Sequence, residues 1–193
     1  FTAGVFLASG SVNDPEKEYH LEFCSPEEKI AEDSLQTDTV CMFKFDKKSA
    51  ELLSITEPER PTGSQIFGNS PETMAIAAKK ALEYSPDFID INMGCPAPKV
   101  ASSGGGALLM KNPVASAEIV KAVVNASTVP VTVKMRAGWD DSNINAVELA
   151  KRCEQAGAAA ITVHGRTKVQ MYAPPVNRDI IAQIKINFFI LVN

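Results

Sequence analysis

The sequence lacks the features that mark several common classes of protein. Its four cysteines, Cys24, Cys41, Cys95 and Cys153, form no Cys-x-x-Cys pair, and the chain has only two histidines. We therefore expect neither a disulfide framework nor a metal site. Apolar runs such as FFILV are far shorter than the roughly 18 residues that cross a bilayer, and no signal peptide is recognisable. These absences predict a cytoplasmic protein with reduced thiols and no membrane partner.

Two nucleotide-binding motifs are also missing. The glycine-rich segment SSGGGALLMK lacks the Gly-Lys-Ser/Thr ending with which a P-loop holds phosphates and magnesium. The pair Gly104-x-Gly106 lacks the third spaced glycine of a dinucleotide-binding fingerprint. The glycines therefore need another explanation.

Charge is divided unevenly along the chain. The net charge is −4, but residues 1–59 hold 13 acidic and 5 basic side chains, and residues 60–193 hold 10 acidic and 14 basic ones. A basic excess of this kind is compatible with a polyanionic partner for the second part. A solvated surface explains so small an excess equally well.

From residue 60 onward, helical patterns alternate with short runs rich in β-branched residues. Helices are expected after Ser70-Pro71, after Asn112-Pro113, and over NINAVELAKRCEQA, where Asp141 or Ser142 is the expected cap. The expected strands are SQIF, DFIDIN, PVTVKM, AAITVHG and FFILVN. The later strands lie roughly 30 residues apart, as βαβ units require. The pattern predicts a parallel α/β protein.

Polar side chains alternate with apolar ones along three of these strands. Asp90 and Asn92 share one strand face, and the next strands repeat the pattern with Lys134-x-Arg136 and His164-x-Arg166. A buried parallel strand with a purely structural role would be apolar on both faces. Because α/β folds assemble sites at the carboxyl ends of their strands, the three strands together predict a site there. Taken singly, each residue is more typical of packing or of a solvated surface.

Six segments together resemble the tRNA-dihydrouridine synthases, in order from about Glu57 to Asn193. They are ERPTGSQIFG, DINMGCPAPKV, SGGGALL, VPVTVKMRAGWDD, INAVELAK and GAAAITVHGRTKVQMY. The resemblance implies a TIM (β/α)8-barrel, incomplete at the C-terminal end of this chain. Residues 1–59 would be a poorly matched N-terminal part of the barrel, and residues 60–193 its catalytic βα units. The C-terminal helical domain with which the family binds tRNA is absent from the sequence.

The same resemblance implies an FMN-dependent reductase that saturates the 5,6 double bond of uracil in tRNA. NADPH would reduce the flavin, hydride would pass to carbon 6, and Cys95 would act as general acid at carbon 5. Before Glu57 only Ala3-Gly4-Val5 resembles the family's opening strand, without the Pro and Met that usually precede it.

The remaining roles are carried over by position. Gln65, Lys134 and His164 match contacts to the flavin ring, and Asn193 is the one residue present of the family's phosphate-binding turn. Arg136 matches a flavin or RNA contact. Asn92 would bind the uracil edge and Lys99 would contact tRNA. Arg166, which like Arg136 fits either a flavin or an RNA contact, is assigned to the tRNA.

Two alternatives stay open at this point. One is a truncated, non-catalytic remnant that binds RNA or protein through its basic half. The other is a different FMN barrel oxidoreductase, similar to the dihydroorotate dehydrogenases. Cys95 in a Gly-Cys-Pro corner, together with Lys134 and His164, favours the tRNA enzyme over the second.

Overall fold

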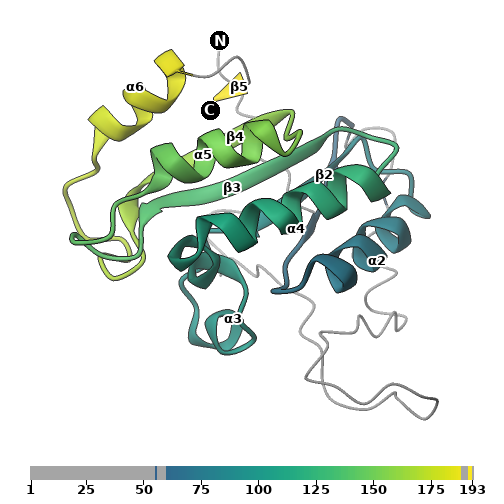
Figure 1. Ribbon diagram of the computed structural model, residues 1–193, viewed down its shortest axis with the longest axis horizontal. Coiled ribbons are helices and arrows are strands. Elements are labelled where there is room, and N and C mark those ends of the chain that lie inside the picture. Colours follow the sequence, from purple (N-terminus) through teal and green to yellow (C-terminus); the bar gives the residue numbers. More distant parts are fainter. Residues whose placement is uncertain (1–54, 56–59, 188–190, 193) are drawn as a thin grey trace, which may run out of the picture.

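The protein is described here by a computed structural model that covers residue 55, residues 60–187 and residues 191–192. Strands and helices alternate along this part of the chain (Figure 1). Their order is β1 (Gly63–Ile66), α2 (Pro71–Leu82), β2 (Phe88–Met93), α3 (Pro98–Ser102), η2 (Gly106–Lys111), α4 (Pro113–Ala126), β3 (Val131–Gly138), α5 (Ala146–Gln155), β4 (Ala160–Thr167), α6 (Arg178–Asn187) and β5 (Leu191–Val192).

The strands form one parallel sheet in which spatial order follows chain order, β1-β2-β3-β4-β5. This confirms the predicted parallel α/β class. Four expected strands are present within a few residues of their predicted bounds, and of the last only Leu191–Val192 belongs to the described residues. Among these residues β1 pairs only with β2 and β5 only with β4, so the described sheet is open.

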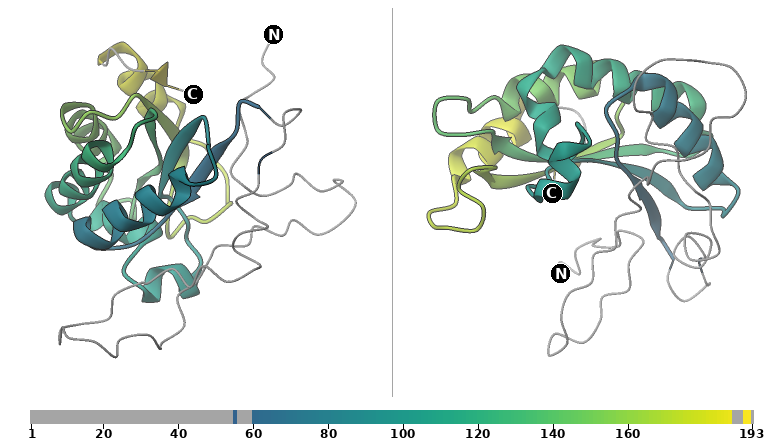
Figure 2. Two further views of the ribbon diagram at one scale, coloured as in Figure 1. Left: turned by 90° about the vertical axis from the view of Figure 1, so that its right-hand side faces the viewer. Right: turned by 90° about the horizontal axis from the view of Figure 1, so that it is seen from below.

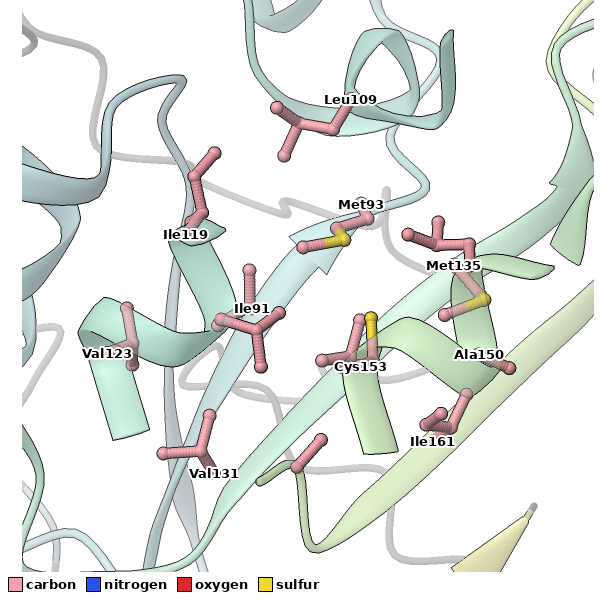
Figure 3. Close-up of a cluster of buried hydrophobic side chains, with 14 of the residues drawn as sticks. Ile91, Met93, Leu109, Ile119, Val123, Val131, Met135, Ala150, Cys153 and Ile161 are labelled. Carbon is pink, nitrogen blue, oxygen red and sulfur yellow. The ribbon is translucent and has the colours of Figure 1, made fainter. Parts of the chain in front are cut away.

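One face of the sheet is apolar and is covered by helices. Figure 2 shows α2, α4 and α5 on the same side of the strands. Ile91 and Met93 of β2, Met135 of β3 and Ile161 of β4 are fully buried there (Figure 3). Full burial of such a side chain contributes about 1.5–3 kcal/mol, so this layer is the main stabilising element. The other face carries the polar residues of the strands.

Two helices begin as the sequence predicts. The Ser70 hydroxyl accepts a hydrogen bond from the Thr73 backbone N–H at 3.3 Å, and the Asn112 side chain accepts one from Ala115 at 3.2 Å. Each cap is followed by a proline in the first turn, where no intrahelical donor is needed.

The start of α5 differs from the prediction, which placed the cap at Asp141 or Ser142. The helix begins at Ala146, and Asn145 is its N-cap residue. The backbone N–H of Ser142 instead donates to the Asp140 carboxylate at 3.0 Å, which holds the preceding residues in a turn. The expected capping residues belong to this turn, which the helical periodicity of the sequence does not reveal.

In the described part of the chain, no helix is both long and apolar enough to cross a membrane.

Candidate active site

The polar face of the sheet brings most of the predicted site residues side by side. Along each strand every second side chain points to this face. The strand register pairs residues as follows: Gln65 with Asp90, Asn92 with Lys134, and Arg136 with His164. Side chains from four neighbouring strands therefore lie in adjacent rows on one surface.

Cys95 lies at the corner where the chain leaves β2. The side-chain oxygen of Asn92 accepts hydrogen bonds from the backbone N–H groups of Gly94 at 3.1 Å and Cys95 at 2.9 Å. The carbonyl of Cys95 accepts a bond from the backbone N–H of Ala107 at 3.0 Å. Cys95 is half-buried and its thiol is free. The corner thus holds a partly accessible thiol beside the polar face of the sheet.

The glycine run packs directly against this corner. Gly106 has φ of +59°, a conformation that other residues rarely adopt. A Cβ atom there would lie 2.8 Å from the Cys95 carbonyl oxygen and equally close to the Val100 side chain. Gly105 approaches the backbone N of Gly68 closely enough to place a Cβ at 3.3 Å. Close backbone packing at this corner accounts for glycine at these positions.

Four side chains on the polar face form one hydrogen-bonded network. Gln65 Nε2 donates to Asp90 Oδ2 at 2.7 Å, and Asn92 Nδ2 donates to Gln65 Oε1 at 2.9 Å. Thr132 Oγ1 donates to Asp90 Oδ1 at 2.5 Å. Burial raises the pKa of the Asp90 carboxyl, while the bonds from Thr132 and Gln65 and the charge of Lys134 oppose that rise.

Lys134 brings a positive charge to the same face. Burial lowers the pKa of its ammonium, the neighbouring Arg136 lowers it further, and Asp90 acts in the opposite direction. Among the described residues, the Lys134 ammonium has no hydrogen-bond or ion-pair partner. A partly buried cation without a partner is a suitable site for an anionic or electron-rich ligand.

His164 is neutral and has a defined tautomer. Burial lowers its pKa to about 4, helped by the charges of Arg136, Lys134 and Arg166. Arg166 Nη1 lies 3.1 Å from His164 Nε2. Because a guanidinium can only donate, Nε2 accepts and the ring proton is on Nδ1. Arg166 also donates to the Ala173 carbonyl at 2.9 Å. His164 therefore offers one N–H donor, and Arg166 keeps it oriented.

Arg136 is only 3% exposed and is directed at the backbone. Its Nε donates to the Gly94 carbonyl at 2.7 Å. Its Nη1 donates to the carbonyls of Thr167 at 3.1 Å and Met171 at 2.8 Å. Arg136 thus joins the Gly-Cys-Pro corner to the end of β4 and to the following loop. The sequence pattern alone does not indicate this use.

A cationic cluster outside the predicted set lies on neighbouring loops. The Lys111 ammonium is 4.0 Å and the Lys168 ammonium 4.8 Å from the centroid of the Trp139 ring. The three residues come from the end of η2 and from the loops that follow β3 and β4. Because the contacts join residues far apart in the chain, the one tryptophan of the sequence was the single signal that could have pointed to them.

Some predicted residues cannot be placed. Asn193 and Ala3-Gly4-Val5 lie outside the described residues, and so does the side chain of Lys99. In the described part of the chain, no group of three or more His, Cys, Asp or Glu side chains is arranged to hold a metal ion.

Comparison with known proteins gives a match over most of the chain. The sequence model of the family described as "Dihydrouridine synthase (Dus)" matches residues 38–193. A "Probable tRNA-dihydrouridine synthase 1" from Synechocystis is 45% identical over 70% of this chain and 38% of the relative. "tRNA-dihydrouridine synthase B" of Pseudomonas aeruginosa is 43% identical over 77% of this chain and 45% of the relative. The chain thus spans less than half the length of these curated relatives.

A second family model matches the beginning of the sequence. The WhiA LAGLIDADG-like domain matches residues 1–52, and its match overlaps the first one over residues 38–52. The dihydrouridine synthase match begins before Glu57, where the sequence resemblance was first recognisable. The assignment of residues 1–59 to the barrel stays a prediction.

Proposed function

The chain belongs to the dihydrouridine synthase family, and on that premise we propose that it is part of the catalytic barrel of a flavin-dependent tRNA-dihydrouridine synthase. The reaction is reduction of the uracil 5,6 double bond, with NADPH as reductant. The observation that carries the proposal is the half-buried Cys95 thiol beside a face that also presents Lys134 and His164.

The barrel is supported by the arrangement of the strands. Parallel strands in chain order, with α2, α4 and α5 on one face, match successive βα units of a TIM barrel. In a doubly wound sheet the strand order reverses and helices cover both faces. The polar face described above would then line the barrel interior, and its site would lie at the carboxyl ends of the strands.

The residues on this face fit the ring system of FMN. Gln65 keeps one N–H and one oxygen lone pair outside its network, so it can both donate to and accept from a heterocycle edge. His164 offers its Nδ1–H, and Lys134 offers a positive charge that has no partner among the described residues. These three residues would hold the flavin ring, and Asn193 would contribute to phosphate binding.

Bound FMN, reduced by NADPH, would supply hydride to carbon 6 of the uracil. Cys95 would hold a proton on Sγ and deliver it to carbon 5 as general acid. Lys134 would stabilise the negative charge that develops next to the ring. Asn92 retains one Nδ2–H, which can donate to a uracil oxygen without breaking its bond to Gln65.

The proposed partner is tRNA, and the cationic cluster supports it. Lys111 and Lys168 flank Trp139 on the loops that follow the strands, the side on which a barrel binds its substrate. Lysine ammonium groups bind RNA phosphates, and an indole between them can stack on a base. Arg166, beside His164, would contact the RNA nearer the reacting base.

The test is a comparison of two cysteine variants. Cys95→Ala should lower the rate of dihydrouridine formation per folded molecule by about 10² to 10⁴, the usual contribution of general acid catalysis. Cys153→Ala is the matched control, because Cys153 is fully buried in the core and burial raises the pKa of its thiol to about 12. It should lower stability and leave the rate per folded molecule nearly unchanged.

Rates are measured on unmodified tRNA with FMN and NADPH, and the folded fraction is taken from a urea titration. Near-normal turnover in folded Cys95→Ala would reject the role of the thiol. Absence of any turnover in the unsubstituted chain, with flavin and tRNA both bound, would instead favour a non-catalytic remnant. Reduction of a free pyrimidine in preference to tRNA would favour the dihydroorotate dehydrogenase-like alternative.

A further inference from the structure

Asp90 lies on the polar face of the sheet and has no role in the proposed binding of flavin and tRNA or in proton transfer. It lies on β2, two residues before Asn92 and on the same face. Its two oxygens accept bonds from Thr132 at 2.5 Å and from Gln65 at 2.7 Å. Because burial disfavours a carboxylate, the fold retains it here against a cost.

The network that begins at Asp90 has a defined direction. Asp90 Oδ2 accepts the hydrogen bond from Gln65, so the Gln65 amide presents Nε2 to Asp90. Its Oε1 then faces Asn92, which must present Nδ2. The Asn92 side-chain oxygen is left to face the corner, where it accepts from the backbone.

The other end of the network imposes the same direction independently. The backbone N–H groups of Gly94 and Cys95 can only donate, so they require an oxygen from Asn92. This places the Asn92 nitrogen against Gln65 and the Gln65 nitrogen against Asp90. Two chemically different ends therefore agree on the orientation of both amides, so that neither can turn over without leaving a polar group unpaired.

We propose that Asp90 is a positioning residue that acts through Gln65 and Asn92 to hold the Cys95 corner in place. It supplies an acceptor that keeps the Gln65 amide in one orientation, and Gln65 in turn keeps the Asn92 oxygen on the corner. The hydrogen bonds of Asp90 in the described part of the chain go to Gln65 and Thr132 and not to the Cys95 thiol, so Asp90 reaches the ligand-binding face only through Gln65.

The network leaves Gln65 and Asn92 able to form hydrogen bonds to a ligand. After the internal bonds are counted, Gln65 retains an N–H and a lone pair, and Asn92 retains an N–H. The same residues can therefore bind a ligand while they support the corner. The benefit for catalysis rests on the proposed function, whereas the positioning itself does not depend on any ligand.

The test is hydrogen exchange of the Gly94 and Cys95 amides, measured by NMR on the full chain without ligand. Asp90→Leu removes the acceptor at similar volume and should speed this exchange about tenfold, the effect of weakening a hydrogen bond. Asp90→Asn keeps an acceptor oxygen for Gln65 and should stay within about twofold of the unsubstituted chain. Thr132→Val is the matched control, because it removes the other bond to Asp90 and leaves the path to the corner intact.

A double variant tests whether Asp90 acts through Gln65. Gln65→Met alone should speed exchange of the two amides about tenfold, and adding Asp90→Leu should then have little further effect. Met135 and Val163, in the middle of the sheet, report any general loosening and should exchange as in the unsubstituted chain.

Four results would overturn the proposal. The first is unchanged exchange at the corner in folded Asp90→Leu or in Gln65→Met. The second is equal acceleration by Asp90→Asn and Asp90→Leu, since charge and not the acceptor would then matter. The third is a full additional effect of Asp90→Leu in the Gln65→Met background. The fourth is acceleration of exchange at Met135 equal to that at the corner. If Asp90→Leu does not fold, Asp90→Val takes its place in these measurements, because it also removes the acceptor for Gln65. None of these measurements involves turnover, so failure of the proposed enzymatic function would be seen separately.

Discussion

Replacement of Arg136 by methionine should destabilise the protein strongly, although the new side chain is apolar and of similar length. The guanidinium makes three bonds to carbonyls, those of Gly94, Thr167 and Met171. Bonds that involve a charged partner contribute about 1.5–3 kcal/mol each, and the relief of burying a charge offsets part of their sum. Because three acceptors lose their donor, we expect a net loss of about 3–5 kcal/mol in the free energy of unfolding.

Urea titration of the unsubstituted chain, Arg136→Met and Arg136→Lys measures this loss. A lysine ammonium cannot reproduce the planar arrangement of donors, so Arg136→Lys should lose about half as much as the methionine variant. Trypsin cleavage after Lys168 should also become faster, since one of the three bonds holds the loop that follows it. A loss below about 1 kcal/mol in Arg136→Met, at an unchanged m-value, would show that the buried arginine is not what joins these segments.

Two further predictions concern charge. The pKa of His164 is about 4 in the folded chain and near 6.5 when unfolded, so the unfolded state binds more protons between these values. The free energy of unfolding should therefore be highest above pH 6.5 and fall as the pH drops toward 4. His164→Gln should reduce that fall in urea titrations. An identical pH profile in the variant would contradict the lowered pKa of His164. Lys111→Ala and Lys168→Ala should each weaken tRNA binding and reduce the salt slope of log affinity by about 0.7 to 0.9. Filter binding over a salt series measures this, with Lys121→Ala as control because Lys121 is an exposed residue of α4. A salt slope that neither lysine substitution changes would remove the cluster from the RNA surface.

The strands and their polar face follow from the sequence because both depend on local pattern. Alternation of apolar and polar residues in DFIDIN and PVTVKM is enough to predict that one face is buried under helices and that the other is polar. The caps at Ser70 and Asn112 are equally local, since each oxygen bonds an amide three residues later. Such features need no knowledge of the neighbouring strand.

The uses of particular side chains could not be predicted in the same way. The link from Asp90 to Gln65 depends on strand register, which joins residues from different βα units. Arg136 alternates in step with Lys134, so the pattern gives both the same face, but tertiary packing directs Arg136 to three carbonyls. The start of α5 was predicted wrongly because a turn before it uses the backbone of the expected capping residue.

The order of the strands also bears on how the protein folds. Each strand pairs with the strand that follows it in the chain, as Gly63 with Phe88 and Thr132 with Ala160, so every pairing closes a loop of one βα unit. The entropic cost of closing a loop rises only slowly with loop length. The loop-closure cost is therefore similar for each strand pairing. β3 and β4 share the longest paired stretch of the described sheet, so we expect them to be a favourable nucleus to which neighbouring units add in succession. A sheet built this way can grow from either edge without rearranging what has already formed.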